Sequence, residues 1–291
     1  MKPVPFKYIA VASLEQALSL KATYGDDAKF LAGGQSLMPA MNFRLARPAI
    51  LIDINPLDDL AGVKRANGKT GVGALTRYRS LETDSSFIRH FPLFGEALPH
   101  IAHPQIRNRG TIGGNLSHAD PASELPALIV ALEATLKVKS SAVERSIAAA
   151  DFFQGLLTTD LQPDEMLVEI ELPEQKPQTG TCFMEVARRR GDFAIAGAAA
   201  IVTLDQDNIC THARLALCGV GETPVDASDA AAILVGHRID PEALAEVADA
   251  VRHLVEPAGN THASPDYQRH VAATLAQRTL TSANDRARHG A

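Results

Sequence analysis

The sequence predicts an α+β protein of two domains, and three observations support that prediction. The chain has 291 residues, which is long for one hydrophobic core and short for three. Short strand-like runs are mixed with segments whose apolar residues recur at helical spacing. A polar segment with two prolines, residues 173–180, separates a longer part from a shorter one. We therefore expect a first domain over residues 1–175, subdivided near residues 55–60, and a second over residues 178–285.

Composition and charge exclude several classes of protein. The chain is 46% hydrophobic and 21% charged, close to an average soluble domain, which excludes disorder and collagen-like structure. The net charge of −6 argues against a surface for nucleic acid or anionic lipid. The three scattered cysteines are too few for a disulfide framework or a four-cysteine iron–sulfur cluster.

The sequence offers no membrane segment. No apolar run reaches the roughly 18–20 residues that cross a bilayer, so no integral membrane span is expected. The apolar core of a signal peptide is also missing, because Pro3, Pro5 and Lys7 interrupt the first residues. We therefore expect a cytoplasmic protein.

The first 55 residues are typical of a β-α-β-loop-β unit. A helix is predicted from Ser13 to about Gly25, because Ser13 is followed three residues later by Gln16, the pattern of a capping box. Leu14 and Leu18 then recur at helical spacing. The predicted strands are residues 7–10, 28–31 and 48–54.

The rest of the first domain is predicted to combine a hairpin with helices and strands. Asn67-Gly68 is typical of a two-residue hairpin turn between strands at residues 63–65 and 70–74. A phosphate-binding Walker loop is excluded there, because the spacing has one residue too many. Residues 103–110 form a basic, turn-like stretch. The remaining predicted elements are helices at residues 80–87, 92–101 and 122–136 and strands at residues 136–139 and 167–172.

The second domain is predicted to contain strands followed by two helices. Asp240-Pro241 and Ser264-Pro265 are each typical of an N-cap with proline at the first helical position. The second helix is predicted to include residues 271–280, and the polar tail, residues 281–291, is expected to be loose. The predicted strands are residues 196–204 and 212–220.

Two glycine pairs are candidate ligand-binding segments. The first glycine segment, residues 31–37, reads Leu-Ala-Gly-Gly-Gln-Ser-Leu and follows a predicted strand; the second, residues 109–116, reads Arg-Gly-Thr-Ile-Gly-Gly-Asn-Leu. Glycines let backbone N–H groups approach an anion and form a nest, and Ser36 and Thr111 add hydroxyl donors. The two segments together can bind one pyrophosphate. On these residues alone the alternative of two ordinary tight turns stays open.

Two further groups of polar residues follow. Asp120 can cap the helix after the second glycine segment, or a carboxylate there can accept hydrogen bonds from ligand hydroxyls. His118 stays open between ligand contact and helix entry. Three arginines at residues 188–190, followed by Asp192 and Phe193, indicate either a solvated strip or the border of a planar cofactor or partner subunit.

In their order along the chain, these motifs resemble the FAD-binding medium subunit of molybdenum hydroxylases, the family of aerobic carbon monoxide dehydrogenase and xanthine dehydrogenase. The matching residues are Ala-Gly-Gly-Gln-Ser-Leu at 32–37 followed by Pro39 and Arg44-Leu45, Thr-Ile-Gly-Gly-Asn at 111–115, Ala-Asp-Pro at 119–121 and Arg-Arg-Gly-Asp-Phe-Ala at 189–194. The resemblance covers nearly the whole chain. It implies a two-part FAD-binding domain of the vanillyl-alcohol-oxidase type, followed by a small α+β C-terminal domain.

The resemblance also implies which residues bind FAD. The two glycine segments would bind the pyrophosphate, Glu124 or else Asp120 would contact the ribityl chain, and Leu167 would border the adenine. Asp192 and Phe193 would lie near the isoalloxazine, where some relatives carry tyrosine and so offer a hydroxyl that Phe193 lacks. The predicted FAD-binding residues are Leu31, Ala32, Gly33, Gly34, Gln35, Ser36, Leu37, Thr111, Ile112, Gly113, Gly114, Asn115, His118, Asp120, Glu124, Leu167, Asp192 and Phe193.

The role that the resemblance implies is electron transfer. In the family, a large subunit oxidises the substrate at a molybdenum cofactor, and a small subunit carries two [2Fe–2S] clusters. The FAD of the medium subunit receives electrons singly and delivers them to an external acceptor. The resemblance therefore implies both partner subunits, a dimer of heterotrimers, and no catalytic acid, base or nucleophile in this chain.

Two other functions stay open on the sequence. A self-sufficient flavin oxidase or reductase of the same domain type would need a base over the flavin or a histidine linked to it, for which His100, His103 and His118 are candidates. The second open function is that of a binding or assembly protein that has lost FAD, but the intact glycines of both segments weigh against it.

Overall fold

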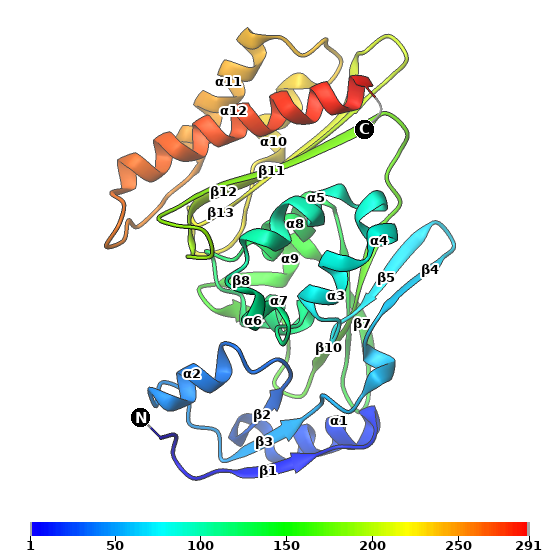
Figure 1. Cartoon of the computed structure of the whole chain (residues 1–291), viewed down its shortest axis with the longest axis vertical. Helices are drawn as coiled ribbons and strands as arrows, with labels where there is room; N and C mark the ends of the chain where they lie inside the picture. The colour runs from blue at the N-terminus through cyan, green and yellow to red at the C-terminus, as the bar shows by residue number, and fades with distance from the viewer. Residues whose placement is uncertain (1, 290–291) are drawn as a thin grey trace.

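The computed structural model describes residues 2–289 and is elongated, with three parts stacked along its long axis (Figure 1). The N-terminal sheet lies at one end, and the C-terminal sheet with the long helix α12 (Pro265–His289) lies at the other. Three clusters of buried hydrophobic residues follow the same order. Within residues 2–289, no helix is both long and apolar enough to cross a bilayer.

The N-terminal part is a small parallel sheet with one helix packed on it. Its strands are β1 (Lys7–Ala10), β2 (Ala28–Leu31) and β3 (Ile50–Asp53), in the order β1-β3-β2. The helix α1 (Leu14–Tyr24) follows Ser13, whose hydroxyl accepts a hydrogen bond from the Gln16 N–H. The predicted β-α-β-loop-β unit is confirmed, except that the predicted loop contains a further helix, α2 (Leu37–Asn42).

The middle part contains an antiparallel five-stranded sheet. Its strands are β4 (Val63–Ala66), β5 (Lys69–Gly73), β6 (Thr135–Lys139), β7 (Glu144–Ala148) and β10 (Met166–Pro173), in the order β4-β5-β10-β6-β7. The predicted hairpin is confirmed, because Asn67 and Gly68 have φ angles of 54° and 71°, as a type I′ turn requires. A separate two-stranded ribbon consists of β8 (Phe153–Gly155) and β9 (Thr158–Thr159).

Short helices cover this sheet, and several differ from the prediction. The helix predicted at residues 80–87 is two helices, because the Asp84 carboxylate accepts hydrogen bonds from the first N–H groups of the second. The stretch at residues 103–110 contains a helix, and the helix predicted at residues 122–136 ends before Glu133, where φ is 53°. The helices are α3 (Tyr78–Thr83), α4 (Ser85–His90), α5 (Pro92–Ala97), α6 (Pro104–Arg107), α7 (Ile112–His118), α8 (Glu124–Ala131) and α9 (Ala149–Phe152).

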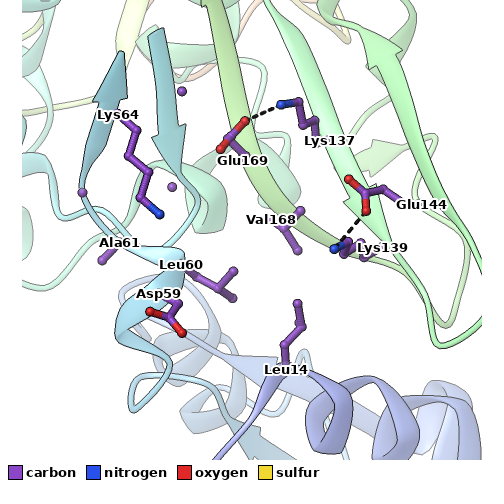
Figure 2. A pocket seen from close by; sticks show the side chains of 13 residues that line it. Leu14, Asp59, Leu60, Ala61, Lys64, Lys137, Lys139, Glu144, Val168 and Glu169 are labelled. Carbon is purple, nitrogen blue, oxygen red and sulfur yellow. Dashed lines mark hydrogen bonds and ion pairs between the residues drawn. The ribbon is translucent and has the colours of Figure 1, made fainter. Parts of the chain in front are cut away.

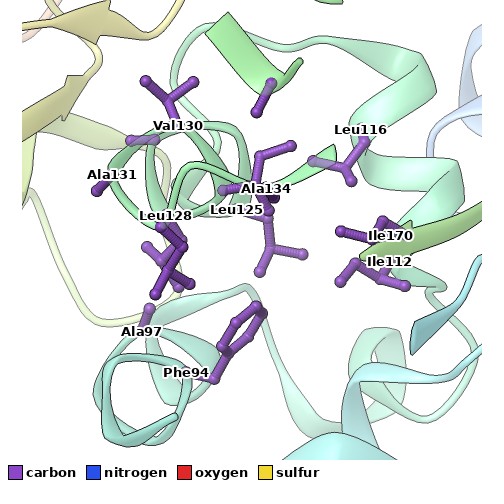
Figure 3. Packing of buried hydrophobic residues seen from close by; sticks show 14 of the residues in the cluster. Phe94, Ala97, Ile112, Leu116, Leu125, Leu128, Val130, Ala131, Ala134 and Ile170 are labelled. Carbon is purple, nitrogen blue, oxygen red and sulfur yellow. The ribbon is translucent and has the colours of Figure 1, made fainter. Parts of the chain in front are cut away.

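The helix α8 is the centre of the middle core. Every residue of this helix is buried. Figure 3 shows its leucines close to Phe94 of α5, Ile112 of α7 and Ile170 of β10. A helix that is buried all round is apolar all round, which explains why this segment has no polar stripe.

The C-terminal part is an antiparallel sheet with helices on one face. The strands are β11 (Thr179–Ala187), β12 (Ala194–Leu204), β13 (Cys210–Cys218) and β14 (Val225–Asp226), and the helices are α10 (Ser228–Ala231), α11 (Pro241–Leu254) and α12. The other face packs against α5 and α8, so β12 is buried along its whole length. Phe183, Ala199 and Cys218 consequently belong to the same hydrophobic cluster as α8.

The strand β11 is absent from the sequence prediction, which assigned its first residues to the linker. Thr179, Gly180 and Thr181 interrupt the apolar pattern at the start of the strand. The structure nevertheless pairs the whole segment with β12, from Thr179 opposite Thr203 to Ala187 opposite Ala194. Pairing with an apolar neighbour therefore decided the conformation here, as it often does for strands.

The prediction of a loose tail is wrong as far as His289, where α12 ends; residues 290–291 lie outside the described part of the chain. Ala283 and Ala287 are buried against β11. They approach it at Gly180, where a side chain would collide with the Ala283 carbonyl. The Arg286 guanidinium also donates to the carbonyl of Thr181 and to the carboxylate of Glu96 on α5.

The N-cap of α11 supports a testable prediction. The Asp240 carboxylate accepts a hydrogen bond of 2.8 Å from the Ala243 N–H, which confirms the predicted cap. Asp240→Ala removes that acceptor, and we expect the free energy of unfolding in urea to fall by about 1 kcal/mol. Asp240→Asn keeps an acceptor and should retain most of that stability. An equal loss in both variants would contradict the capping role.

Candidate functional site

The two glycine segments meet at one cavity, where the N-terminal sheet joins the middle part. The cavity has a volume of about 610 Å³, within the range of roughly 300–1,000 Å³ that is common for ligand pockets. The segments touch directly: a Cβ atom added to Gly33 would lie 2.5 Å from the Arg109 carbonyl oxygen and 2.9 Å from the Gly110 Cα. Glycine at position 33 is therefore needed for the two backbones to approach each other.

The first glycine segment connects β2 to α2 and offers free backbone donors. Gly34 has a φ of +70°, a left-handed conformation that glycine adopts without strain. The N–H groups of Gly33, Gly34, Gln35 and Ser36 donate to no other residue within residues 2–289. The Ser36 side chain makes no capping hydrogen bond to α2, so its hydroxyl also remains available. This segment has the donors that an anion site requires.

The second glycine segment is not the loop that the sequence predicted. Thr111 is the N-cap of α7, and its hydroxyl accepts a hydrogen bond of 3.1 Å from the Gly114 N–H. The N–H of Ile112 donates to the Thr76 carbonyl, and that of Gly113 to the Ala74 carbonyl. These three N–H groups are therefore already paired, whereas the Thr111 N–H donates to no other residue within residues 2–289. The predicted nest is narrower in this segment than the glycine pair suggested, and its contact with a pyrophosphate stays a prediction.

Twelve of the eighteen predicted residues line the cavity. They are Ala32, Gly33, Gly34, Gln35, Ser36, Leu37, Thr111, Gly113, Gly114, Asn115, His118 and Leu167. Six do not line it, namely Leu31, Ile112, Asp120, Glu124, Asp192 and Phe193. For all eighteen, a contact with FAD stays a prediction.

Glu124 is buried at the start of α8, with 5% of its surface exposed. Burial, together with the negative charge of Glu185, raises the pKa of its carboxyl to about 8. Glu124 therefore carries a proton over most of the neutral range and can donate a hydrogen bond as well as accept one. Asp120 instead accepts a hydrogen bond of 3.0 Å from the Ala122 N–H, in the local capping role that the sequence left open.

Asp192 and Phe193 lie in the turn between β11 and β12. Phe193 is 70% exposed, and the carboxylate of Asp192 accepts hydrogen bonds of 3.0 and 3.1 Å from the Arg189 guanidinium. Gly191 has a φ of +87° and packs against the Ala102 carbonyl. The turn is thus fixed against the middle part, with its aromatic side chain on the surface.

One wall of the cavity was not expected from the sequence. It consists of residues 157–166, which run from the turn before β9 to the first residue of β10 and carry no recognisable motif. Arg145 of β7 holds this wall, because its guanidinium donates to Glu165 at 2.7 and 2.8 Å and to Asp160 at 2.6 Å. The one local signal is Leu157, an apolar side chain that stays 53% exposed at the cavity.

A second cavity, of about 190 Å³, lies between the start of α1 and the outer face of the middle sheet (Figure 2). Two ion pairs between neighbouring strands line one side of it, Lys137 with Glu169 at 2.6 Å and Lys139 with Glu144 at 2.9 Å. None of the predicted residues lines it. Within residues 2–289, no group of three or more His, Cys, Asp or Glu side chains is arranged to hold a metal ion.

The residues at the larger cavity fit FAD. The free N–H groups of the first glycine segment and the Ser36 hydroxyl suit a pyrophosphate. Leu161, Met166 and Leu167 provide an apolar wall for a planar ring. Gly114 has no Cβ atom, which leaves room beside the Thr111 hydroxyl. A Cβ atom added at Gly114 would lie 2.7 Å from that hydroxyl oxygen.

Comparison with known proteins gives a consistent result over the whole chain. Residues 4–175 match the FAD binding domain in molybdopterin dehydrogenase, and residues 181–283 match the CO dehydrogenase flavoprotein C-terminal domain. The chain is 42% identical to the 6-hydroxypseudooxynicotine dehydrogenase complex subunit alpha of Paenarthrobacter nicotinovorans, over 99% of this chain and 97% of that protein. It is 36% identical to the carbon monoxide dehydrogenase medium chain of Hydrogenophaga pseudoflava, over 97% and 98% of the two chains.

Solved structures agree with the sequence comparison. A chain of the carbon monoxide dehydrogenase from Hydrogenophaga pseudoflava superposes with a TM-score of 0.96 at 37% identity, covering 98% of this chain and 99% of that one. Both parts of the chain therefore share the fold of that solved chain. The chain belongs to the family of FAD-binding medium subunits of molybdenum hydroxylases.

Proposed function

We propose that the chain binds FAD without a covalent bond and transfers electrons from [2Fe–2S] clusters of a partner subunit to an external acceptor. The observation that carries this proposal is that both glycine segments line one cavity in a domain of the FAD-binding family. The names of the relatives, a dehydrogenase complex subunit and a dehydrogenase medium chain, support a role inside a larger assembly.

The chain's own residues have to bind and orient the cofactor. The two glycine segments would bind the pyrophosphate, the first through its free N–H groups and the second beside it at Thr111. Leu167 would border the adenine. Glu124 would contact the ribityl chain, and Asp192 with Phe193 would approach the isoalloxazine. Since these last three side chains do not line the cavity, their contacts require the flavin to extend beyond it. The bound FAD supplies the ability to accept electrons singly and release them singly or in pairs.

A self-sufficient flavin oxidase is less well supported. It would need a histidine or another base at the flavin, and of the three candidates only His118 lines the cavity. His100 is engaged elsewhere, with its Nδ1 atom 3.0 Å from the Glu185 carboxylate. The relatives reported above are subunits or chains of dehydrogenases, so no catalytic acid, base or nucleophile of this chain is required.

We propose a heterotrimer with a molybdenum-cofactor large subunit and an iron–sulfur small subunit, paired as a dimer of heterotrimers in the cytoplasm. The two relatives named above support this assignment. One is a subunit of a 6-hydroxypseudooxynicotine dehydrogenase complex and the other is the medium chain of a carbon monoxide dehydrogenase, so they belong to dehydrogenases with different substrates. Because chains of this similarity serve different substrates, substrate choice would belong to the large subunit.

Purification from the native host tests the proposal. A mild affinity purification of the tagged chain should yield FAD, iron and molybdenum together with two further polypeptides, measured by absorption spectrum, metal analysis and mass spectrometry. A chain that carries FAD without metals or partners, and that a small molecule reduces directly, would instead favour the self-sufficient flavoenzyme. A chain without any flavin would overturn both.

A further inference from the structure

Two polar residues outside the predicted site join the two glycine segments. Asn55 follows β3 in the N-terminal part, and Arg77 precedes α3 in the middle part. Neither residue lines the cavity. Their side chains are half-buried and meet each other, since the Arg77 Nη2 atom donates to the Asn55 Oδ1 atom at 2.5 Å.

The Asn55 side chain holds the first glycine segment by binding two backbone carbonyl groups of that segment. Its Nδ2 atom donates to the Ala32 carbonyl oxygen at 2.9 Å and to the Leu31 carbonyl oxygen at 3.2 Å. A peptide group is planar and trans, so the Gly33 N–H points opposite to the Ala32 carbonyl. By binding that carbonyl, Asn55 directs the Gly33 N–H away from itself, and this N–H has no partner within residues 2–289.

Asn55 is itself held in place from the N-terminal sheet. The Asp53 Oδ1 atom accepts hydrogen bonds from the Asn55 backbone N–H at 3.0 Å and from Asn55 Nδ2 at 2.5 Å. The second carboxylate oxygen of Asp53 accepts from the Tyr8 hydroxyl. The amide orientation of Asn55 is thereby determined, since its nitrogen faces acceptors and its oxygen faces the Arg77 donor.

Arg77 holds the second glycine segment. Its Nη1 atom donates to the Arg109 carbonyl, at the start of that segment. The backbone on either side of Arg77 is also paired with the segment, because the Tyr78 N–H donates to the Gly110 carbonyl and the Ile112 N–H to the Thr76 carbonyl. The Arg77 guanidinium therefore binds the second glycine segment with one nitrogen and Asn55 with the other, and Asn55 binds the first glycine segment.

We propose that Asn55 and Arg77 form a clamp that sets the separation and orientation of the two glycine segments, and that FAD affinity depends on it. The two residues are positioning residues, because they act through the backbone that would bind the pyrophosphate. The contact between Gly33 and the Arg109 carbonyl leaves little tolerance, so a small displacement of either segment changes the cavity. This inference rests on the proposed binding of FAD at the cavity.

The test compares FAD binding in the complex that contains the wild-type chain, Arg77→Ala, Asn55→Ala and the double variant. Each single variant loses a hydrogen bond to a charged group, and we expect its FAD dissociation constant to rise about tenfold. If the two residues act as one clamp, the double variant should bind FAD about as weakly as the weaker single variant. A merely structural role would instead lower the melting temperature of the FAD-free variants in parallel with FAD binding.

Milder variants and a control make the outcome decisive. Arg77→Lys keeps the charge but not the fork, and Asn55→Gln keeps the amide but moves it by one methylene group. Both should weaken FAD binding without lowering the melting temperature of the FAD-free protein. Arg79→Lys, at an exposed arginine two positions away, should bind FAD as the wild type does. FAD binding within twofold of wild type in the Arg77 and Asn55 variants, or fully additive losses, would overturn the clamp. A wild-type chain without FAD would overturn the proposed function instead.

Discussion

A chain with Gly34→Val is expected to fold and to contain no FAD. Gly34 has a φ of +70°, which a β-branched residue adopts only with strain. The added Cβ atom would lie 3.2 Å from Leu31 Cδ1 and 3.3 Å from Met38 Cγ, so these side chains would have to shift, and relief of the backbone strain would change the φ of the first glycine segment. Its free N–H groups would then no longer converge on one anion. FAD per chain, measured from the absorption spectrum after purification, should fall to near zero.

Gly236→Val is the matched control for this experiment. Gly236 also has a positive φ, +85°, and an added Cβ would meet no atom within 4 Å, but it lies in the C-terminal part, away from the cavity. The backbone strain is comparable, so this variant should lose similar stability and keep its FAD. Normal FAD content in Gly34→Val would refute the assignment of the first glycine segment to the cofactor.

Glu124→Gln is expected to make the protein more stable at alkaline pH. The pKa of Glu124 is about 8 in the folded protein and near the ordinary value of 4.5 after unfolding. The folded state therefore binds this proton more tightly, and its contribution to stability is lost as pH rises from about 5 through 8. Between about pH 5 and pH 9 the loss is on the order of 4 kcal/mol in the wild type and absent in the glutamine variant.

Urea denaturation of the FAD-free protein at both pH values measures this difference. The glutamine variant should be close to wild type at the lower pH and clearly more stable at the higher one. Glu222→Gln, at an exposed glutamate, removes the same charge from the surface and should show no such gain. A constant difference between Glu124→Gln and wild type across the pH range would contradict a raised pKa.

Local signals were sufficient for many elements of the fold. Ser13 and Asp240 cap the helices that follow them, and Asn67-Gly68 makes the predicted hairpin turn. These signals work because the hydrogen bonds involved join residues only a few positions apart. The strand β11 and the end of α12 carry no such signal. Their conformation depends on burial against each other at Gly180, which joins residues about a hundred positions apart.

The candidate site shows the same division between local and tertiary information. By itself, the sequence determined that two glycine segments exist, that they resemble a known cofactor site, and which residue types they offer. The tertiary structure decided how they are used. It pairs the N–H groups of Ile112, Gly113 and Gly114 in the second segment and leaves those of the first segment free. It also adds the wall at residues 157–166 and joins both segments through Asn55 and Arg77. The physical reason is that the packing of the whole chain determines which distant residue lies within hydrogen-bond distance, and no local sequence pattern contains that information.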